Sequence, residues 1–220
     1  HQPLSYPNYP ITSSKFQFQH QKSITMPWNL RSDTVTRPTP EVRTAMANAI
    51  VGDDAHGDCP TMKQLETLAA TITGKAAAVF VVSGTAGNLC SMMAYCEKRG
   101  SEVITGDKAH MILYEGGGIS AVAGALVRTV HTNSDGSLDL KEIENNIRKS
   151  QDIMFPQTVA IATETTHCSL GGKVVPLQFF QELKVLAEKY SIPVHLDGAR
   201  MFNAGMWIIF CSVCYNSFLF

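Results

Sequence analysis

Helical periodicity alternates with short apolar runs along this chain. Apolar residues recur every three or four positions in several stretches, and this spacing predicts amphipathic helices. The predicted helices span residues 40–49, 62–73, 86–99, 140–147 and 177–190. Thr39 and Asp139 are residue types that cap helix N-termini, and each stands directly before an apolar stretch. Thr61 and Gln64 have the spacing of a capping box, which indicates that a helix also begins there.

Short runs between these helices are wholly or mainly apolar, which is typical of strands that are covered on both faces. The predicted strands span residues 76–82, 103–105, 125–130, 158–163 and 194–196. Strands that alternate with helices pair in parallel through right-handed crossovers. We therefore expect an α/β domain with α/β/α layers around a mostly parallel sheet.

The bulk composition is that of one sizeable globular domain. The chain has 220 residues and a formal net charge of −1, so it carries no charge excess that would attract nucleic acid or an acidic membrane. Its 6 cysteines do not form the dense framework of a disulfide-stabilised protein. This cysteine usage is typical of a reducing compartment, and we expect a cytoplasmic protein without a nucleic-acid or membrane partner.

The two ends of the chain differ in composition from its middle. Residues 1–27 are rich in Pro, Gln, Ser and Tyr and contain no acidic side chain, so we expect a disordered leader or upstream read-through. Residues 205–220 are apolar and uncharged, but this segment is shorter than the ~20 residues that span a membrane. The domain is therefore expected to occupy residues 28–204, and residues 205–220 are expected to be an aberrant tail.

Residues with binding or catalytic potential follow several of the predicted strands. In a parallel sheet the carboxyl ends of the strands meet at one edge, and ligands gather there. The Ser-Gly-Thr turn at residues 83–85 lies between an apolar run and a helix, where free N–H groups can bind a phosphate. His110, His167 and Asp197 lie at or near the ends of other predicted strands. We therefore expect these residues to share one site.

Each of these signals is weak when it stands alone. A glycine turn between a strand and a helix is often structural, and a single histidine can simply cap a loop. Asp197 is more telling, because a carboxylate at the end of a buried strand can hold the cationic ring nitrogen of pyridoxal phosphate. No P-loop and no G-x-G-x-x-G occurs, so a nucleotide-binding domain is the least favoured alternative. The histidines are dispersed, and no metal site is predicted.

Whole segments between residues 28 and 204 match one enzyme family in register. They are Leu30–Pro38, Val51–Asp54, Gly57–Asp58, Pro60–Thr61, Ser83–Thr85, His110, Tyr114–Gly117, Gly171–Pro176 and His195–Ala204. With these segments the chain resembles the low-specificity L-threonine aldolases, which depend on pyridoxal 5'-phosphate (PLP) and have the fold type I of aspartate aminotransferase. The resemblance implies retro-aldol cleavage of L-threonine or L-allo-threonine to glycine and acetaldehyde.

The resemblance also implies which residues bind PLP. Gly84 and Thr85 would hold the cofactor phosphate, and His110 would stack on the pyridine ring. Asp197 would pair with the ring nitrogen, and Arg200 would steady that end of the cofactor.

Further roles concern the substrate, a small β-hydroxy amino acid. Ser32 would contact the substrate carboxylate, and His167 matches a histidine that is a candidate base for the substrate hydroxyl. His110 would also take part in proton transfer. The resemblance further implies that the complete protein is a homo-oligomer.

The chain departs from the family after Ala204. Related proteins continue to a lysine that forms a Schiff base with PLP and then to a small domain, whereas no lysine follows Arg200 here. We therefore expect a truncated member of the family whose own activity is impaired. The open alternatives are a non-catalytic partner that binds a full-length subunit, and a PLP-dependent lyase that catalyses β-elimination.

Overall fold

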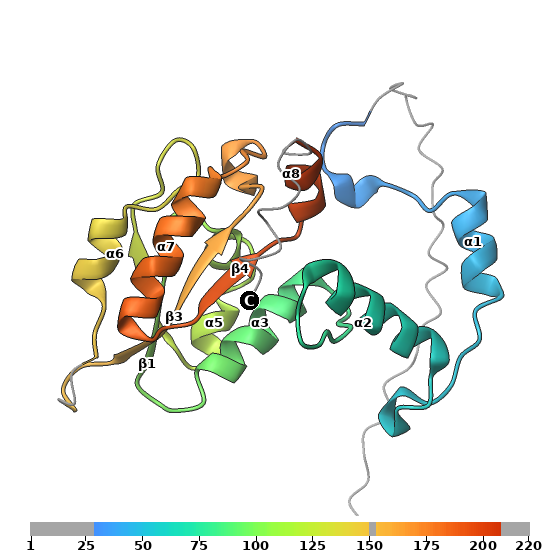
Figure 1. Ribbon diagram of the computed structural model, residues 1–220, viewed down its shortest axis with the longest axis horizontal. Helices are drawn as coiled ribbons and strands as arrows, with labels where there is room; N and C mark the ends of the chain where they lie inside the picture. The colour runs from blue at the N-terminus through green and yellow to red at the C-terminus, as the bar shows by residue number, and fades with distance from the viewer. Residues whose placement is uncertain (1–28, 150–152, 208–220) are drawn as a thin grey trace, which may run out of the picture. The chain divides into compact units, whose positions relative to one another are not determined.

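The computed structural model describes residues 29–149 and 153–207 (Figure 1). The predicted leader and most of the predicted tail lie outside these residues. Contacts divide the chain into two units, His1–Ala49 and Ile50–Phe220, and each is described by itself.

The described part of the first unit contains a 3-10 turn, η1 (Asp33–Val35), and one helix, α1 (Pro40–Ala47). Thr39 caps α1 as predicted, because its Oγ1 accepts a hydrogen bond of 3.4 Å from the backbone N–H of Val42. The helix ends two residues before the predicted end, Ala47 being its last residue.

The second unit contains the sheet and the remaining described helices. The strands are β1 (Ser101–Gly106), β2 (Leu126–Val130), β3 (Gln157–Glu164) and β4 (Val194–Asp197). The helices are α2 (Pro60–Thr73), α3 (Gly84–Tyr95), α4 (His110–Leu113), α5 (Gly118–Ala121), α6 (Leu140–Asn146), α7 (Leu177–Tyr190) and α8 (Met201–Trp207), with 3-10 turns η2 (Asp54–His56) and η3 (Cys168–Leu170).

The described sheet is parallel, with the strand order β2-β1-β3-β4. Gly106 at the end of β1 pairs with Val130 at the end of β2, and Glu164 at the end of β3 pairs with Asp197 at the end of β4. The carboxyl ends of all four strands therefore lie along one edge, where ligands gather in parallel sheets.

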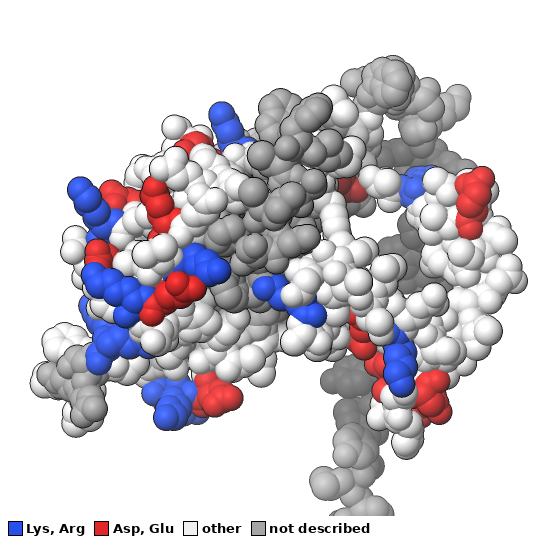
Figure 2. All heavy atoms as spheres, viewed as in Figure 1, with Lys and Arg blue, Asp and Glu red and all other residues white. Residues whose placement is uncertain are grey.

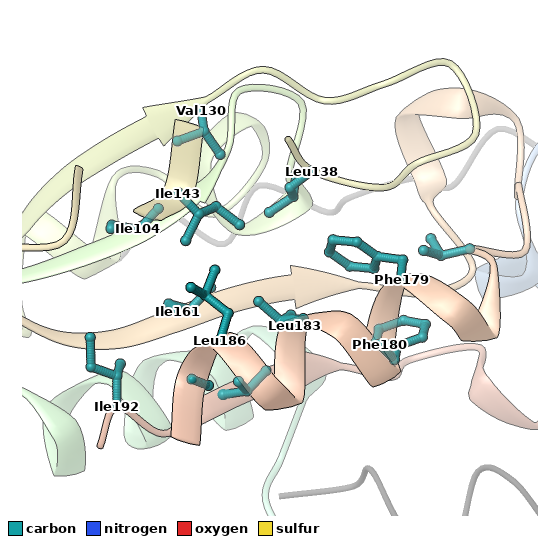
Figure 3. Close-up of a cluster of buried hydrophobic side chains, with 13 residues drawn as sticks. Ile104, Val130, Leu138, Ile143, Ile161, Phe179, Phe180, Leu183, Leu186 and Ile192 are labelled. Atoms are coloured by element: carbon teal, nitrogen blue, oxygen red, sulfur yellow. The ribbon is translucent and has the colours of Figure 1, made fainter. Parts of the chain in front are cut away.

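Helices cover both faces of this sheet, and the period-two alternation of strand side chains separates two hydrophobic clusters. Ile104 and Ile161 point to one face, where they pack with Ile143 of α6 and with α7. Figure 3 shows Leu183 and Leu186 of α7 beside Ile161 of β3.

The neighbouring strand residues point to the opposite face. There Val103 and Ala160 pack against Met92 of α3, Met111 of α4 and Ile119 of α5. The predicted α/β/α layers are therefore confirmed.

One predicted strand is wrong. Residues 76–82 form no strand, and the side chains of Val79 and Val82 are 76% and 90% exposed. A strand needs a hydrogen-bonded neighbour, and no described strand pairs with this segment. The backbone N–H of Phe80 instead donates to Glu66 Oε1 of α2 at 2.8 Å.

The predicted capping box is also wrong. Helix α2 begins at Pro60 after the N-cap residue Cys59, which makes no side-chain capping bond. Thr61 lies inside the helix, and its hydroxyl donates to the backbone carbonyl of Ile50. Proline is favoured at the first helical position, and this preference places the helix start two residues earlier than the box requires.

Surface charges of both signs are interspersed on the face shown in Figure 2, where basic and acidic side chains alternate over α6 and α7. One such pair joins the two helices, with Lys189 Nζ 2.6 Å from Glu144 Oε1. Among the described helices, none combines the length and the apolar character that a membrane crossing requires.

Candidate functional site

The N-terminus of α3 presents unpaired backbone N–H groups. Ser83 caps the helix, since its Oγ accepts from Ala86 N at 3.1 Å and its carbonyl accepts from Gly87 N at 3.0 Å. No described residue accepts a bond from the N–H groups of Gly84 and Thr85. A β-carbon placed at Gly84 would meet no described atom within 4 Å, so the space over this turn is open. This geometry suits an anion, because the helix dipole adds to the two free donors.

Asn88 lies one helical turn after this N-terminus and joins it to the end of β4. Its side chain is 6% exposed, and its Nδ2 donates to Asp197 Oδ2 at 2.9 Å. Four residues of α-helix rise only about 6 Å. The Asp197 carboxylate is therefore held close to the turn that contains Gly84 and Thr85.

Asp197 is half-buried and receives a second hydrogen bond, from Ala199 N to its Oδ1 at 3.2 Å. Two residues before it on β4, His195 is buried, and its Nε2 lies 2.9 Å from Asn88 Oδ1. Burial lowers the pKa of His195 below its usual 6.5, and the negative charge of Asp197 opposes part of that shift. The imidazole of His195 is therefore neutral at pH 7.

His110 begins α4 just after β1, and its ring is held by Glu115. Nδ1 of His110 lies 2.9 Å from Glu115 Oε1, and the two side chains are 30% and 5% exposed. The ring of Tyr114 lies beside the imidazole, with 5.3 Å between the ring centroids and an interplanar angle of 45°. His110 thus keeps an accessible imidazole in a defined orientation.

Glu164 ties the segment around His110 to the segment after β3. Its Oε2 accepts from the backbone N–H of His110 at 2.8 Å, and its Oε1 accepts from Cys168 N at 2.7 Å. Because Glu164 is the last residue of β3 and Asp197 the last of β4, both carboxylates lie on the same edge of the sheet.

His167 is much less accessible than His110. Its ring is 2% exposed, and its Nδ1 has no hydrogen-bond partner among the described residues. The backbone of Gly136 approaches it closely, since a β-carbon there would lie 3.2 Å from the Cβ of His167 and 2.9 Å from Val175 Cγ2. A buried polar atom without a partner is costly and is expected mainly where a group has a functional role.

Two of the residues named from the sequence are not placed in this cluster. Arg200 is half-buried in the turn before α8, where its carbonyl accepts from Asn203 N and Ala204 N. Ser32 belongs to the first unit, where its Oγ caps η1 by accepting from Thr34 N at 3.2 Å. The structure brings together Gly84, Thr85, His110 and Asp197, and it joins the segment of His167 to that of His110 through Glu164, which accepts from Cys168 N and His110 N.

The structure adds residues to which the sequence analysis assigned no role. Asn88, Glu115, Glu164 and His195 each hold another residue of the cluster in place. The sequence could have pointed to Asn88, because this residue lies four positions after the predicted site residue Gly84, and residues four apart on a helix share a face.

The ligand atoms of His110, Glu115 and Asp197 lie within 4.8 Å of one another, close enough to surround a cation. The amide of Asn88 already donates to both carboxylates, with 2.9 Å between its nitrogen and each acceptor oxygen. Hydrogen bonds account for the proximity of these groups, and we assign no metal to the site.

Comparison of the sequence with known proteins identifies the family to which the chain belongs. The family model described as beta-eliminating lyase matches residues 29–213. A probable low-specificity L-threonine aldolase 2 of Arabidopsis thaliana is 46% identical over 179 residues, which are 81% of this chain and 50% of that protein. A low specificity L-threonine aldolase of Escherichia coli is 40% identical over 176 residues, 80% of this chain and 51% of that protein.

Solved structures agree on the fold. A threonine aldolase of Leishmania major superposes with a TM-score of 0.66 at 21% identity, covering 78% of this chain and 49% of that one. A putative L-allo-threonine aldolase of Listeria monocytogenes gives a TM-score of 0.57 at 20% identity, covering 75% of this chain and 45% of that one. The chain thus spans about half the length of the curated relatives it matches.

Proposed function

Because this chain belongs to the beta-eliminating lyase family, we propose that it carries the PLP-binding region of an enzyme that cleaves L-threonine or L-allo-threonine to glycine and acetaldehyde. Members of this family depend on PLP. The sequence resemblance to low-specificity threonine aldolases is confirmed by relatives that are 40% and 46% identical. The observation that carries the proposal is the Asp197 carboxylate, held by Asn88 close to the open N-terminus of α3.

The residues present fit PLP at both of its charged ends. The free N–H groups of Gly84 and Thr85, under an open turn, suit the phosphate. The Asp197 carboxylate suits a protonated ring nitrogen, and the accessible ring of His110 suits the face of the pyridine. When bound, PLP supplies the electron sink for the negative charge that develops at the substrate Cα.

The proton positions follow from the partners of each imidazole. We propose that the Glu115 carboxylate accepts a hydrogen bond from Nδ1 of His110, 2.9 Å away. This arrangement leaves Nε2 as the ring nitrogen that faces away from Glu115, and we propose this atom as the proton acceptor on the accessible side of the site.

Other roles rest on the family resemblance. We propose His167 as the base for the substrate hydroxyl, which its unpartnered buried Nδ1 supports. We propose that Ser32 contacts the substrate carboxylate and that Arg200 steadies the cofactor. Loss of acetaldehyde formation in a His167→Asn variant of the whole enzyme, with PLP still bound, is the expected result for His167.

The proposal extends to a homo-oligomer in the cytoplasm. The described cysteines Cys59, Cys90, Cys96 and Cys168 all carry free thiols, which suits a reducing compartment. Sedimentation of the whole protein measures the number of subunits.

PLP titration of the 220-residue chain tests the central assignment. The absorbance of PLP should shift on binding, and Asp197→Asn should weaken binding about tenfold because it removes the charge opposite the ring nitrogen. Asp135→Asn is the matched control, since Asp135 lies in an exposed turn and bonds to Ser137. Equal affinities of the Asp197→Asn and Asp135→Asn variants would refute the role of Asp197.

The products formed from threonine distinguish the aldolase from a lyase that catalyses β-elimination. We expect the whole enzyme to release glycine and acetaldehyde from L-threonine or L-allo-threonine. Release of ammonia and a keto acid instead would favour the β-eliminating alternative.

A further inference from the structure

Asn88 is the centre of a hydrogen-bond network that links distant segments of the chain. Its Nδ2 lies 2.9 Å from both Glu115 Oε1 and Asp197 Oδ2, and its Oδ1 lies 2.9 Å from His195 Nε2. The side chain is only 6% exposed, so water competes little for these bonds. Every polar atom of this amide is therefore used.

Simple donor and acceptor rules assign the protons in the network. The amide NH₂ of Asn88 can only donate, and it faces two carboxylates that only accept. The amide oxygen can only accept, so His195 must carry a hydrogen on Nε2. Since burial disfavours the charged form of His195, its other ring nitrogen carries no hydrogen.

The same amide acts on two carboxylates of equal charge. Oxygens of Glu115 and Asp197 lie within 4.8 Å of each other, close enough to repel. The Asn88 nitrogen places one N–H dipole against each of them, which reduces the repulsion and fixes both orientations. Glu115 in turn determines which nitrogen of His110 carries the hydrogen.

We propose that Asn88 is a positioning residue that sets the orientation of the Asp197 carboxylate directly and the tautomer of His110 through Glu115. The inference rests on the proposed function in one respect, namely that Asp197 and His110 contact PLP. Asn88 itself touches neither the cofactor nor the substrate in this assignment.

The first test reads the tautomers without any cofactor. In the 220-residue chain with ¹⁵N-labelled histidine, long-range ¹H–¹⁵N spectra report which ring nitrogen carries the hydrogen. The wild-type chain should show His195 with a hydrogen on Nε2 and His110 with a hydrogen on Nδ1. His110 with its hydrogen on Nε2 would overturn the inference, and this measurement does not depend on the folding of any variant.

The second test uses variants of one helix. Asn88→Leu removes all three hydrogen bonds at similar size, and Asn88→Asp replaces the NH₂ donor with an acceptor. Ser91→Ala is the control on the same helix, since the Ser91 hydroxyl bonds only to Gly87 O among the described residues. Both Asn88 variants release Glu115 Oε1, so the Glu115 carboxylate can turn away from His110 Nδ1 and mixed tautomers are expected at His110, whereas Ser91→Ala should retain the wild-type spectrum. Unchanged His110 signals in an Asn88 variant would contradict the inference.

PLP titration then separates this inference from the proposed function. The Asn88 variants should bind PLP about tenfold more weakly than Ser91→Ala, because a hydrogen bond to a charged group is lost. A wild-type chain with the expected tautomers that binds no PLP would contradict the proposed function and support the network. Tight PLP binding by wild type and Asn88→Leu alike would refute Asn88 as a positioning residue.

Discussion

Glu102 shows how a single residue can be buried with its charge. Its side chain is 0% exposed at the amino end of β1, at the sheet edge opposite the site. Its Oε2 lies 2.9 Å from Arg128 Nε and 3.5 Å from Arg148 Nη1, and its Oε1 accepts from the hydroxyl of Thr158 at 3.2 Å. The carboxylate is therefore tolerated only because these partners replace water.

We expect Glu102→Gln to lower the free energy of unfolding by about 2 kcal/mol, because two arginines then face a neutral amide. Urea unfolding monitored by circular dichroism measures the change. Glu182→Gln is the control, since Glu182 is exposed on α7 and accepts from Gln178. A loss no larger than that of the control would show that the buried pairs contribute nothing.

At the scale of elements, two glycines of helices differ in whether a side chain can replace their hydrogen without a cost in stability. Gly74 ends α2 with a φ of +67°, a left-handed conformation that costs other residues free energy. Gly87 lies inside α3, where a β-carbon would meet only Val81 Cγ2, at 3.5 Å, an ordinary contact. A side chain is thus unfavourable at the first position and acceptable at the second.

Gly74→Ala should lower the free energy of unfolding by about 1 kcal/mol, and Gly87→Ala should raise it by about 0.5 kcal/mol. The two variants are matched controls, because each adds one methyl group to a glycine of a helix. Thermal unfolding of both variants beside the wild type measures the difference. The same sign of change in both variants would contradict the backbone argument.

At the scale of the whole second unit, one histidine couples folding to pH. His195 lies between α3 and the sheet, and its folded pKa is lowered from 6.5 mainly by burial. The unfolded chain therefore takes up the proton first as the pH falls. The stabilisation is complete above the unfolded pKa of 6.5 and is lost as the pH falls from there toward the lowered folded pKa.

The free energy of unfolding should therefore fall below pH 6.5, and His195→Gln should remove part of that fall. Glutamine keeps an N–H donor for Asn88 Oδ1 but does not titrate. Urea titrations of wild type and variant across this range measure the two slopes. Parallel curves would mean that His195 does not contribute to the pH dependence.

The local pattern predicted helices better than strands. Helix α7 spans residues 177–190 as its apolar periodicity indicates, and Asp139 caps α6 by accepting from the N–H groups of Lys141 and Glu142. Such features depend on neighbours within a few residues. Residues 76–82 were wrongly predicted as a strand, because pairing depends on a partner elsewhere in the chain.

The sequence by itself determined the α/β alternation and the family resemblance, and it supplied Gly84, Thr85, His110 and Asp197 as candidate site residues, because motifs and periodicity depend on residues that are close together in the chain. Only the tertiary structure decided that Asn88 bonds to Asp197, which lies 109 residues away, and that Glu115 and Asn88 contact the imidazoles of His110 and His195. Those contacts form when the carboxyl ends of parallel strands meet the start of α3, and no local pattern encodes which distant side chains then come within hydrogen-bonding distance.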